Sequence, residues 1–178
     1  ETAAAWLGAA DFAWLVWTSP HGVDHALALL RQAGGDPVSL RGRRIASVGP
    51  STSRALAAAG LPVTLEASPH DGASLGRALL AASPGPSSAL LFRGNLATQD
   101  LPEILKQAGW AMREAVCYLT RPAPPPPPEL ARRLDQGEFS FIVLCSGSAA
   151  RWLAAHFPPG RLPAAPRLAR LGPATTRV

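Results

Sequence analysis

Apolar and polar positions follow two different periods along residues 12–119. Short apolar runs predict strands at 12–18, 44–48, 62–66, 89–93 and 114–119. None of these runs alternates cleanly between polar and apolar side chains, as expected for parallel strands that are covered on both faces. The segments between them carry apolar residues at helical spacing and predict helices at 23–34, 51–60, 73–83 and 98–109. Strand–helix alternation of this length predicts an α/β fold with a parallel sheet and right-handed crossovers.

A proline-rich segment interrupts this alternation. Six of the seven residues at 122–128 are proline, and such a run favours the stiff polyproline II conformation of a spacer. After it, a helix, a strand, a helix and a strand are predicted at 129–137, 138–146, 148–157 and 166–171. We therefore predict a continuous α/β lobe at 1–120, an interdomain linker at 121–128 and part of a second α/β lobe at 129–178.

Two strand-to-helix turns occur on both sides of the linker and in the same order. WTSPHGV, which contains Ser19, matches CSGSAA, which contains Ser146, and VGPSTS matches LGPATT further along. The repeat predicts two related lobes. The second lobe has only two predicted strands, too few for an independent sheet, and its last turn is followed only by Arg177 and Val178. Because the sequence also begins at Glu1 rather than at Met, we expect further residues at both ends to complete this lobe.

Each repeated turn places the start of a helix directly after a strand. The free N–H groups and the positive end of a helix make such turns anion sites, at the sheet edge where ligands of open α/β folds bind. Ordinary helix capping is the alternative interpretation, and both remain open. A further turn after the strand at 89–93 has the same form. The candidate ligand-binding residues are Thr18, Ser19, Gly49, Ser51, Thr52, Arg93, Gly94, Asn95, Ser146, Gly147, Ser148, Ala149, Gly172 and Thr175.

Four further side chains have open alternatives. Arg93 at a strand end can bind a carboxylate or simply be solvated. Tyr118, the only tyrosine, ends the last strand before the linker. It is either structural or a phenol that donates a proton or a hydrogen bond into a cleft between the lobes. His21 and His25, one helical turn apart, are interpreted as surface residues rather than metal ligands, although His21 stays a candidate because it adjoins a turn.

The composition restricts the function classes. With 47% hydrophobic and 16% charged residues, the chain can bury a core. The net charge is +5, but the arginines are scattered, which disfavours nucleic acid and fits an anionic small ligand. There is no apolar run long enough for a bilayer and no signal-peptide pattern, so we expect a cytoplasmic protein without membrane contact. Cys117 and Cys145 lie in apolar runs and are predicted to be buried free thiols. The dinucleotide, phosphate-loop and nucleophile-elbow motifs are missing, and the histidines lack metal-ligand spacing.

Taken together and in order, these segments resemble the uroporphyrinogen-III synthase family. The segments that carry the resemblance are FAWLVWTSPHGV, RIASVGPSTSRALAAAGL, ALLFRGNLATQDLPEILKQAGWAMREAVCYLT, EFSFIVLCSGSAARWL and RLARLGPATT. The resemblance covers essentially the whole chain and implies two flavodoxin-like lobes with parallel sheets, joined by a two-stranded linker beside a wide cleft. One lobe corresponds to about 1–120, and the other to 123–178 together with an N-terminal segment absent from this sequence.

The resemblance also implies an activity. The family closes the linear tetrapyrrole hydroxymethylbilane into uroporphyrinogen III, with loss of water and inversion of ring D, and without a metal or organic cofactor. A cytoplasmic, monomeric hydro-lyase of haem biosynthesis is therefore implied, and a transient contact with the preceding pathway enzyme is left open. Tyr118 is implied to assist departure of the hydroxyl group, while the turns named above face the cleft. CSGSAA lacks the proline of WTSPHGV, and the linker is unusually rich in proline. The alternative from another class is a non-catalytic two-lobed module that binds an anionic small molecule.

Overall fold

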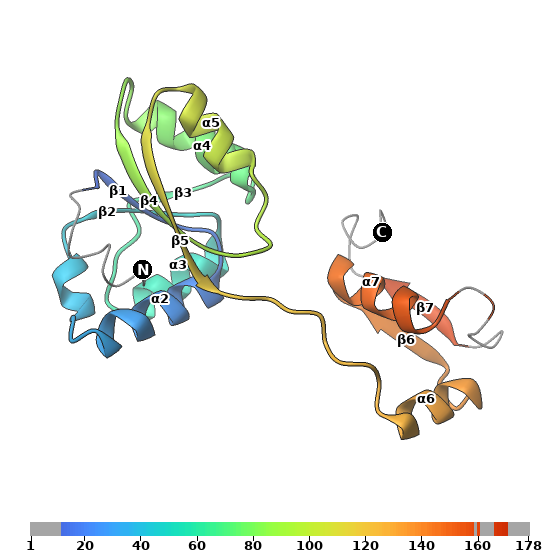
Figure 1. Cartoon of the computed structure of the whole chain (residues 1–178). Helices are drawn as coiled ribbons and strands as arrows, with labels where there is room; N and C mark the ends of the chain where they lie inside the picture. The colour runs from blue at the N-terminus through green and yellow to red at the C-terminus, as the bar shows by residue number, and fades with distance from the viewer. Residues whose placement is uncertain (1–11, 159, 161–165, 171–178) are drawn as a thin grey trace. The chain divides into compact units, whose positions relative to one another are not determined.

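The chain forms two compact units, Glu1–Thr120 and Arg121–Val178 (Figure 1). The computed structural model describes residues 12–158, 160 and 166–170 of them. None of the helices in these ranges has the length and apolar character that a membrane span needs. Each unit is taken by itself below.

The first unit is built on a sheet of five strands, which are β1 (Trp14–Trp17), β2 (Arg44–Ser47), β3 (Leu65–Glu66), β4 (Ser88–Gly94) and β5 (Ala111–Tyr118). All strands are parallel, and their order is β3-β2-β1-β4-β5. The central strand β1 pairs with β2 and with β4, so that Val16 lies between Ala46 and Leu91. The predicted α/β class with parallel strands is confirmed. In the β2-β1-β3-β4-β5 order of flavodoxin, β3 lies beside β1 in the middle of the sheet, whereas here β3 lies beside β2 at one edge.

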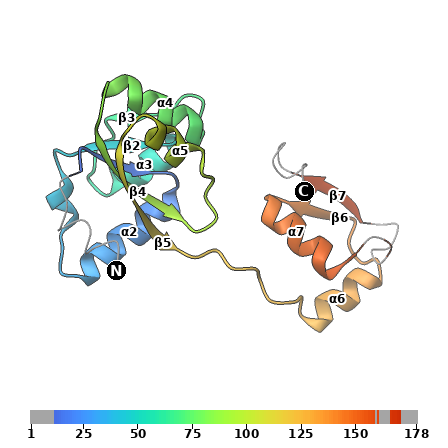
Figure 2. The same ribbon diagram turned by 45° about the horizontal axis from the view of Figure 1, so that its top comes forward.

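Helices cover both faces of this sheet. They are α2 (Pro20–Gln32), the short 3-10 helix η1 (Pro37–Leu40), α3 (Pro50–Ala58), α4 (Gly72–Ala82) and α5 (Asp100–Gln107). Helices α2 and α3 lie on one face, and α4 and α5 lie on the other, as Figure 1 and Figure 2 show. The four α-helices are those that the sequence pattern predicts, and η1 is an addition to them.

Successive residues of β1 face the two opposite cores. Leu15 and Trp17 belong to the buried cluster that includes residues of α2 and α3, whereas Trp14 and Val16 belong to the cluster with α4 and α5. All four side chains are at most 2% exposed. Because both faces are covered, β1 needs no polar positions, which explains its continuous apolar run. Full burial of one such side chain contributes about 1.5–3 kcal/mol, so the four residues of β1 together contribute strongly to the stability of the sheet.

Strand β5 departs from the predicted pattern. Its burial alternates, since Ala115 and Cys117 are buried while Val116 between them is 51% exposed. The physical reason is that β5 is an edge strand, and one of its faces is not covered at this point. The expectation that the strands are covered on both faces is therefore wrong for β5. The strand also begins at Ala111 rather than at 114, because it pairs with β4 from Ser88 onward.

The second unit contains fewer elements. They are α6 (Pro128–Asp135), β6 (Phe141–Leu144), α7 (Gly147–His156) and β7 (Arg167–Arg170), in the order that the sequence predicts. Strands β6 and β7 form a parallel pair. Leu134, Leu153 and Phe157 form a small buried core against one side of this pair. On the other side, Phe141 and Val143 are 59% and 66% exposed.

The two cysteines lie in different environments. Cys117 on β5 is buried, as predicted. Cys145 is exposed, so the prediction of two buried thiols is wrong for this residue. It directly follows β6, whose sheet is covered on one side only, and an apolar run in the sequence does not reveal whether both sides are covered.

We expect iodoacetamide to modify Cys145 and to spare Cys117 in the folded protein at neutral pH. Desolvation by burial raises the pKa of the Cys117 thiol from 9.0 to about 11, and its backbone hydrogen bond with Arg93 opposes this only in part. The thiolate is the reactive form, so burial and the raised pKa both protect Cys117. The folded pKa lies above the unfolded one, so the stabilising effect of this buried thiol is present below about pH 9 and is lost as the pH rises towards 11. Mass spectrometry of the peptides with and without urea measures the difference. Equal modification of both thiols without urea would contradict the expectation that Cys117 is protected.

Candidate functional site

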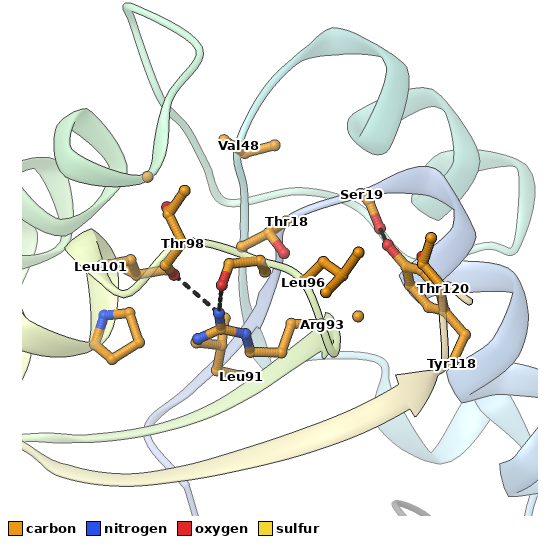
Figure 3. A pocket seen from close by; sticks show the side chains of 14 residues that line it. Thr18, Ser19, Val48, Leu91, Arg93, Leu96, Thr98, Leu101, Tyr118 and Thr120 are labelled. Atoms are coloured by element: carbon orange, nitrogen blue, oxygen red, sulfur yellow. Dashed lines mark hydrogen bonds between the residues drawn. The ribbon is translucent and has the colours of Figure 1, made fainter. Parts of the chain in front are cut away.

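The site lies where the direction of the chain reverses in the sheet. From β1 the chain moves outward through β2 to β3, and from β3 it returns to β4 beside β1 and continues to β5. In open α/β sheets, ligands bind at such a switch point, outside the C-terminal ends of the strands. A cavity of about 330 Å³ lies at this place (Figure 3). It is lined by Thr18 and Ser19 after β1, by Arg93 and Gly94 at the end of β4, and by Tyr118 at the end of β5.

Ser19 connects the start of α2 to Tyr118. It is the N-cap of α2, with Pro20 in the first turn as the sequence predicts, and its Oγ accepts a hydrogen bond from the backbone N–H of Gly22 at 3.0 Å. The same Oγ lies 3.1 Å from the phenol oxygen of Tyr118, and either hydroxyl can donate. When Ser19 donates, the phenol hydrogen of Tyr118 is free for a group in the cavity. Ser19 therefore has two roles, because it caps α2 and also holds the phenol of Tyr118 at the cavity wall.

Gly94 leaves the space that the Tyr118 ring occupies. A Cβ atom at position 94 would lie 2.5 Å from Cζ, 2.6 Å from Cε2 and 2.8 Å from the hydroxyl oxygen of Tyr118. The φ angle of Gly94 is not in the left-handed region. Glycine is therefore required here for the close approach of the ring and not for the backbone conformation.

Arg93 holds the loop that follows β4. Its side chain is 4% exposed, and its Nη1 donates to the carboxylate of Glu114 at 2.8 Å. Its Nη2 donates to the carbonyl oxygens of Ala97 and Thr98, the latter at 2.9 Å. The interpretation of Arg93 as a solvated strand end is wrong, because a buried guanidinium must be satisfied by protein acceptors. Arg93 lines the cavity, and its two terminal nitrogens bind a carboxylate and two carbonyls of the protein, which shapes the wall formed by residues 96–98.

The turn after β2 lies apart from most of the cavity. Gly49 caps α3 without a side-chain hydrogen bond, and a Cβ there would lie 3.0 Å from Cβ of His70. Ser51 is exposed, whereas Thr52 is fully buried and its hydroxyl has no hydrogen-bond partner in the described part of the chain. The only residue of this turn that lines the cavity is Val48. The structure thus brings Ser19, Gly94 and Tyr118 together and leaves Gly49, Ser51 and Thr52 at the next strand end.

Comparison with known proteins indicates independently which protein family the chain belongs to. A family model described as "Uroporphyrinogen-III synthase HemD" matches residues 1–178. The chain belongs to the uroporphyrinogen-III synthase family. This family consists of cyclising lyases of tetrapyrrole biosynthesis, and membership favours the enzyme over the non-catalytic binding module. It also gives a tetrapyrrole as the class of substrate.

Solved structures of two bacterial uroporphyrinogen III synthases share the fold. A triple mutant from Thermus thermophilus is 20% identical, with a TM-score of 0.66, over 98% of this chain and 70% of that one. The wild-type enzyme of the same organism is 19% identical, with a TM-score of 0.60, over 98% and 69% of the two chains. Uroporphyrinogen-III synthetase from Helicobacter pylori is 18% identical, with a TM-score of 0.66, over 92% and 70%. No curated protein matches the chain significantly.

One further candidate turn and one helix start that was not a candidate already have protein partners. The Asn95 amide binds the backbone of Thr120, because its Oδ1 accepts from the Thr120 N–H at 2.7 Å and its Nδ2 donates to the Thr120 carbonyl at 3.2 Å. The pair ties the loop after β4 to the end of the first unit. At the start of α4, the carboxylate of Asp71 accepts the N–H of Ser74 at 2.7 Å, and this hydrogen bond lowers the pKa of Asp71. That helix end is thus already neutralised by a carboxylate of the chain.

The candidate turn of the second unit has the predicted capping geometry. Ser146 is the N-cap of α7, and its Oγ accepts from the Ala149 N–H at 3.2 Å and lies 3.0 Å from Oγ of Ser148. Gly147 is the first residue of α7. The remaining candidates, Gly172 and Thr175, lie outside the described residues.

Two histidines of α2 lie closer to the site than the sequence predicts. His21 and His25 are exposed, as predicted for surface residues, but both imidazole rings contact the ring of Tyr118. Their spacing of one helical turn was the available signal, since it places both rings on the same side of α2. The target of that side could not be predicted, because it depends on how α2 packs against the end of β5.

Proposed function

We propose that this protein closes hydroxymethylbilane to uroporphyrinogen III, and that the switch-point cavity holds one carboxylate-bearing part of this substrate. The match to the family model over residues 1–178 carries the reaction class. A cavity of about 330 Å³ is at the small end of ligand pockets, so it has room for part of a tetrapyrrole and not for the whole. For the intact protein we propose a cytoplasmic monomer, as the family resemblance implies.

Tyr118 is the proposed proton donor. The bond between carbon and oxygen in the hydroxymethyl group breaks, its electron pair leaves with the oxygen, and the phenol proton turns the leaving group into water. The positive charge that remains is delocalised over the pyrrole as an azafulvenium cation. A spiro intermediate then allows ring D to reattach turned over, and the proton lost from the ring-closing carbon restores the phenol. The hydrogen bond between Ser19 and Tyr118 supports this role, because it fixes the phenol oxygen at the cavity wall.

Most of the catalysis is proposed to be positioning. The bilane cyclises unaided to the wrong isomer, so the enzyme has to fold the chain of pyrroles and hold both reacting carbons together. The helix-start amides and hydroxyls of the candidate turns, among them Thr18, Gly49, Ser51 and Ser146, are proposed to bind substrate carboxylates. A few such donors bind anions without bringing large charged side chains near the cation.

We expect Tyr118→Phe to lower kcat for uroporphyrinogen III by roughly 10²-fold, with little change in KM, because it removes the proton donor and keeps the ring. The intact protein is assayed with freshly prepared hydroxymethylbilane, and the type I and type III isomers are separated. An intact wild-type protein that yields only the type I isomer would refute the function. A Tyr118→Phe variant with the wild-type rate would refute the role of the phenol alone.

A further inference from the structure

Two imidazole rings of α2 flank the single tyrosine. The His25 ring stacks on the Tyr118 ring, with centroids 5.5 Å apart and planes inclined by 26°. The His21 ring meets the same ring edge-on, at 6.1 Å and 65°. Both geometries are within the range of favourable aromatic pairs. Since Ser19 also contacts Tyr118, the first two turns of α2 form a three-sided socket for this side chain.

The socket is needed because β5 gives Tyr118 little support. Tyr118 is the last residue of an edge strand, so only β4 lies beside it in the sheet. The residue after it, Leu119, is 59% exposed. The torsion that rotates a tyrosine ring about its axis is broad, so the backbone alone does not fix the ring plane. The hydrogen bond to Ser19 holds one atom of the side chain, Gly94 provides space, and the ring packs only in part against the buried cluster shared by β1 and α2.

We propose that His21 and His25 are positioning residues, which hold the Tyr118 ring so that its hydroxyl stays at the cavity wall. The proposal rests on the catalytic role proposed for Tyr118. The imidazoles contact the ring of Tyr118 and are absent from the lining of the cavity, so they act through the phenol and not on the substrate. Their loss is expected to lower kcat, whereas KM stays near the wild-type value because the binding groups are unchanged.

The test compares variants of His25 and His21 in the intact protein. We expect the double variant His21→Ala/His25→Ala to lose roughly three- to tenfold in kcat at unchanged KM, the factor that corresponds to an aromatic pair. His25→Phe in the otherwise wild-type chain keeps a flat ring on Tyr118 and is expected to retain the wild-type kcat. Asp24→Asn changes an exposed residue of the same helix and serves as the matched control.

A second measurement does not depend on activity. Tyr118 is the only tyrosine of residues 1–178, and in the intact protein labelled with 3-fluorotyrosine its fluorine resonance is assigned as the one that Tyr118→Phe removes. We expect this resonance to shift and broaden in His21→Ala/His25→Ala, and to stay narrow in His25→Phe and in Asp24→Asn. The broadening would report a ring that samples several orientations.

Two results would overturn the proposal. One is a double alanine variant whose kcat and fluorine resonance both equal those of the wild type. The other is a loss of kcat in His25→Phe as large as in the double alanine variant, which would mean that the imidazole itself and not a flat ring is required. Failure of the catalytic role proposed for Tyr118 would be recognised separately, because Tyr118→Phe would then keep the wild-type kcat. In that case the fluorine resonance would still report whether the imidazoles hold the ring.

Discussion

Replacement of Gly94 by alanine is expected to lower kcat for uroporphyrinogen III by roughly 10²-fold, because a small misplacement of a catalytic group has an effect of this size. The added Cβ would lie 2.5 Å from Cζ and 2.8 Å from the hydroxyl oxygen of Tyr118, which is closer than such atoms can approach. Either the ring or the loop after β4 must move. In both cases the phenol oxygen leaves its position 3.1 Å from Ser19 at the cavity wall. Overpacking of this kind also destabilises the fold by about 1–3 kcal/mol.

A double-mutant cycle separates the displaced phenol from a general disturbance. Gly94→Ala is combined with Tyr118→Phe, and kcat is measured for the four proteins at a temperature where all are folded. If the alanine acts through the phenol, it adds little in the Tyr118→Phe background, since residues in direct contact are strongly non-additive. An equally large loss in both backgrounds would contradict this reading, because the alanine would then act on other parts of the site.

The interior of the first unit could be predicted from the sequence because its strands and helices have distinct periods. The buried run of β1 and the helical spacing of α2 to α5 reflect contacts that each element makes along its whole length. The exposed side of β5 and the exposed thiol of Cys145 could not be predicted in this way. The first depends on the strand order, which places β5 at an edge, and the second on which side of the β6–β7 pair is covered. A local sequence pattern contains neither property.

The candidate site was only partly predictable for a related reason. Ser19, Gly94 and Tyr118 each follow or end a predicted strand, and parallel strands end at one edge, so their proximity follows from the fold class. The partner of Arg93 does not follow from it. Glu114 sits opposite Leu91 in the pairing of β4 with β5, and the register of two strands is set by packing that the sequence pattern leaves open. The contact of His21 and His25 with Tyr118 depends in the same way on the docking of α2.

Arg93→Met is expected to lower the free energy of unfolding of the first unit by about 2–4 kcal/mol. Removal of one partner from a buried ion pair costs about 3–5 kcal/mol, and the value is reduced here because the Glu114 side chain is 31% exposed and keeps some hydration. The carbonyl oxygens of Ala97 and Thr98 also lose their donor, so the wall of the cavity loosens.

Urea denaturation followed by tryptophan fluorescence measures this loss, because Trp14 and Trp17 lie in the two cores of the sheet. Arg31→Met is the matched control, since Arg31 is exposed on α2 and its replacement is expected to change the free energy of unfolding by less than about 0.5 kcal/mol. In Arg93→Met/Glu114→Leu the unpaired carboxylate is gone, so we expect part of the stability to return. The carbonyl oxygens of Ala97 and Thr98 still lack a donor in this double variant, so we expect the rest of the lost free energy of unfolding not to be recovered. If Arg93→Met is as stable as Arg31→Met, the buried guanidinium is not what holds residues 96–98, and the cavity wall must be fixed by the packing of α5 alone.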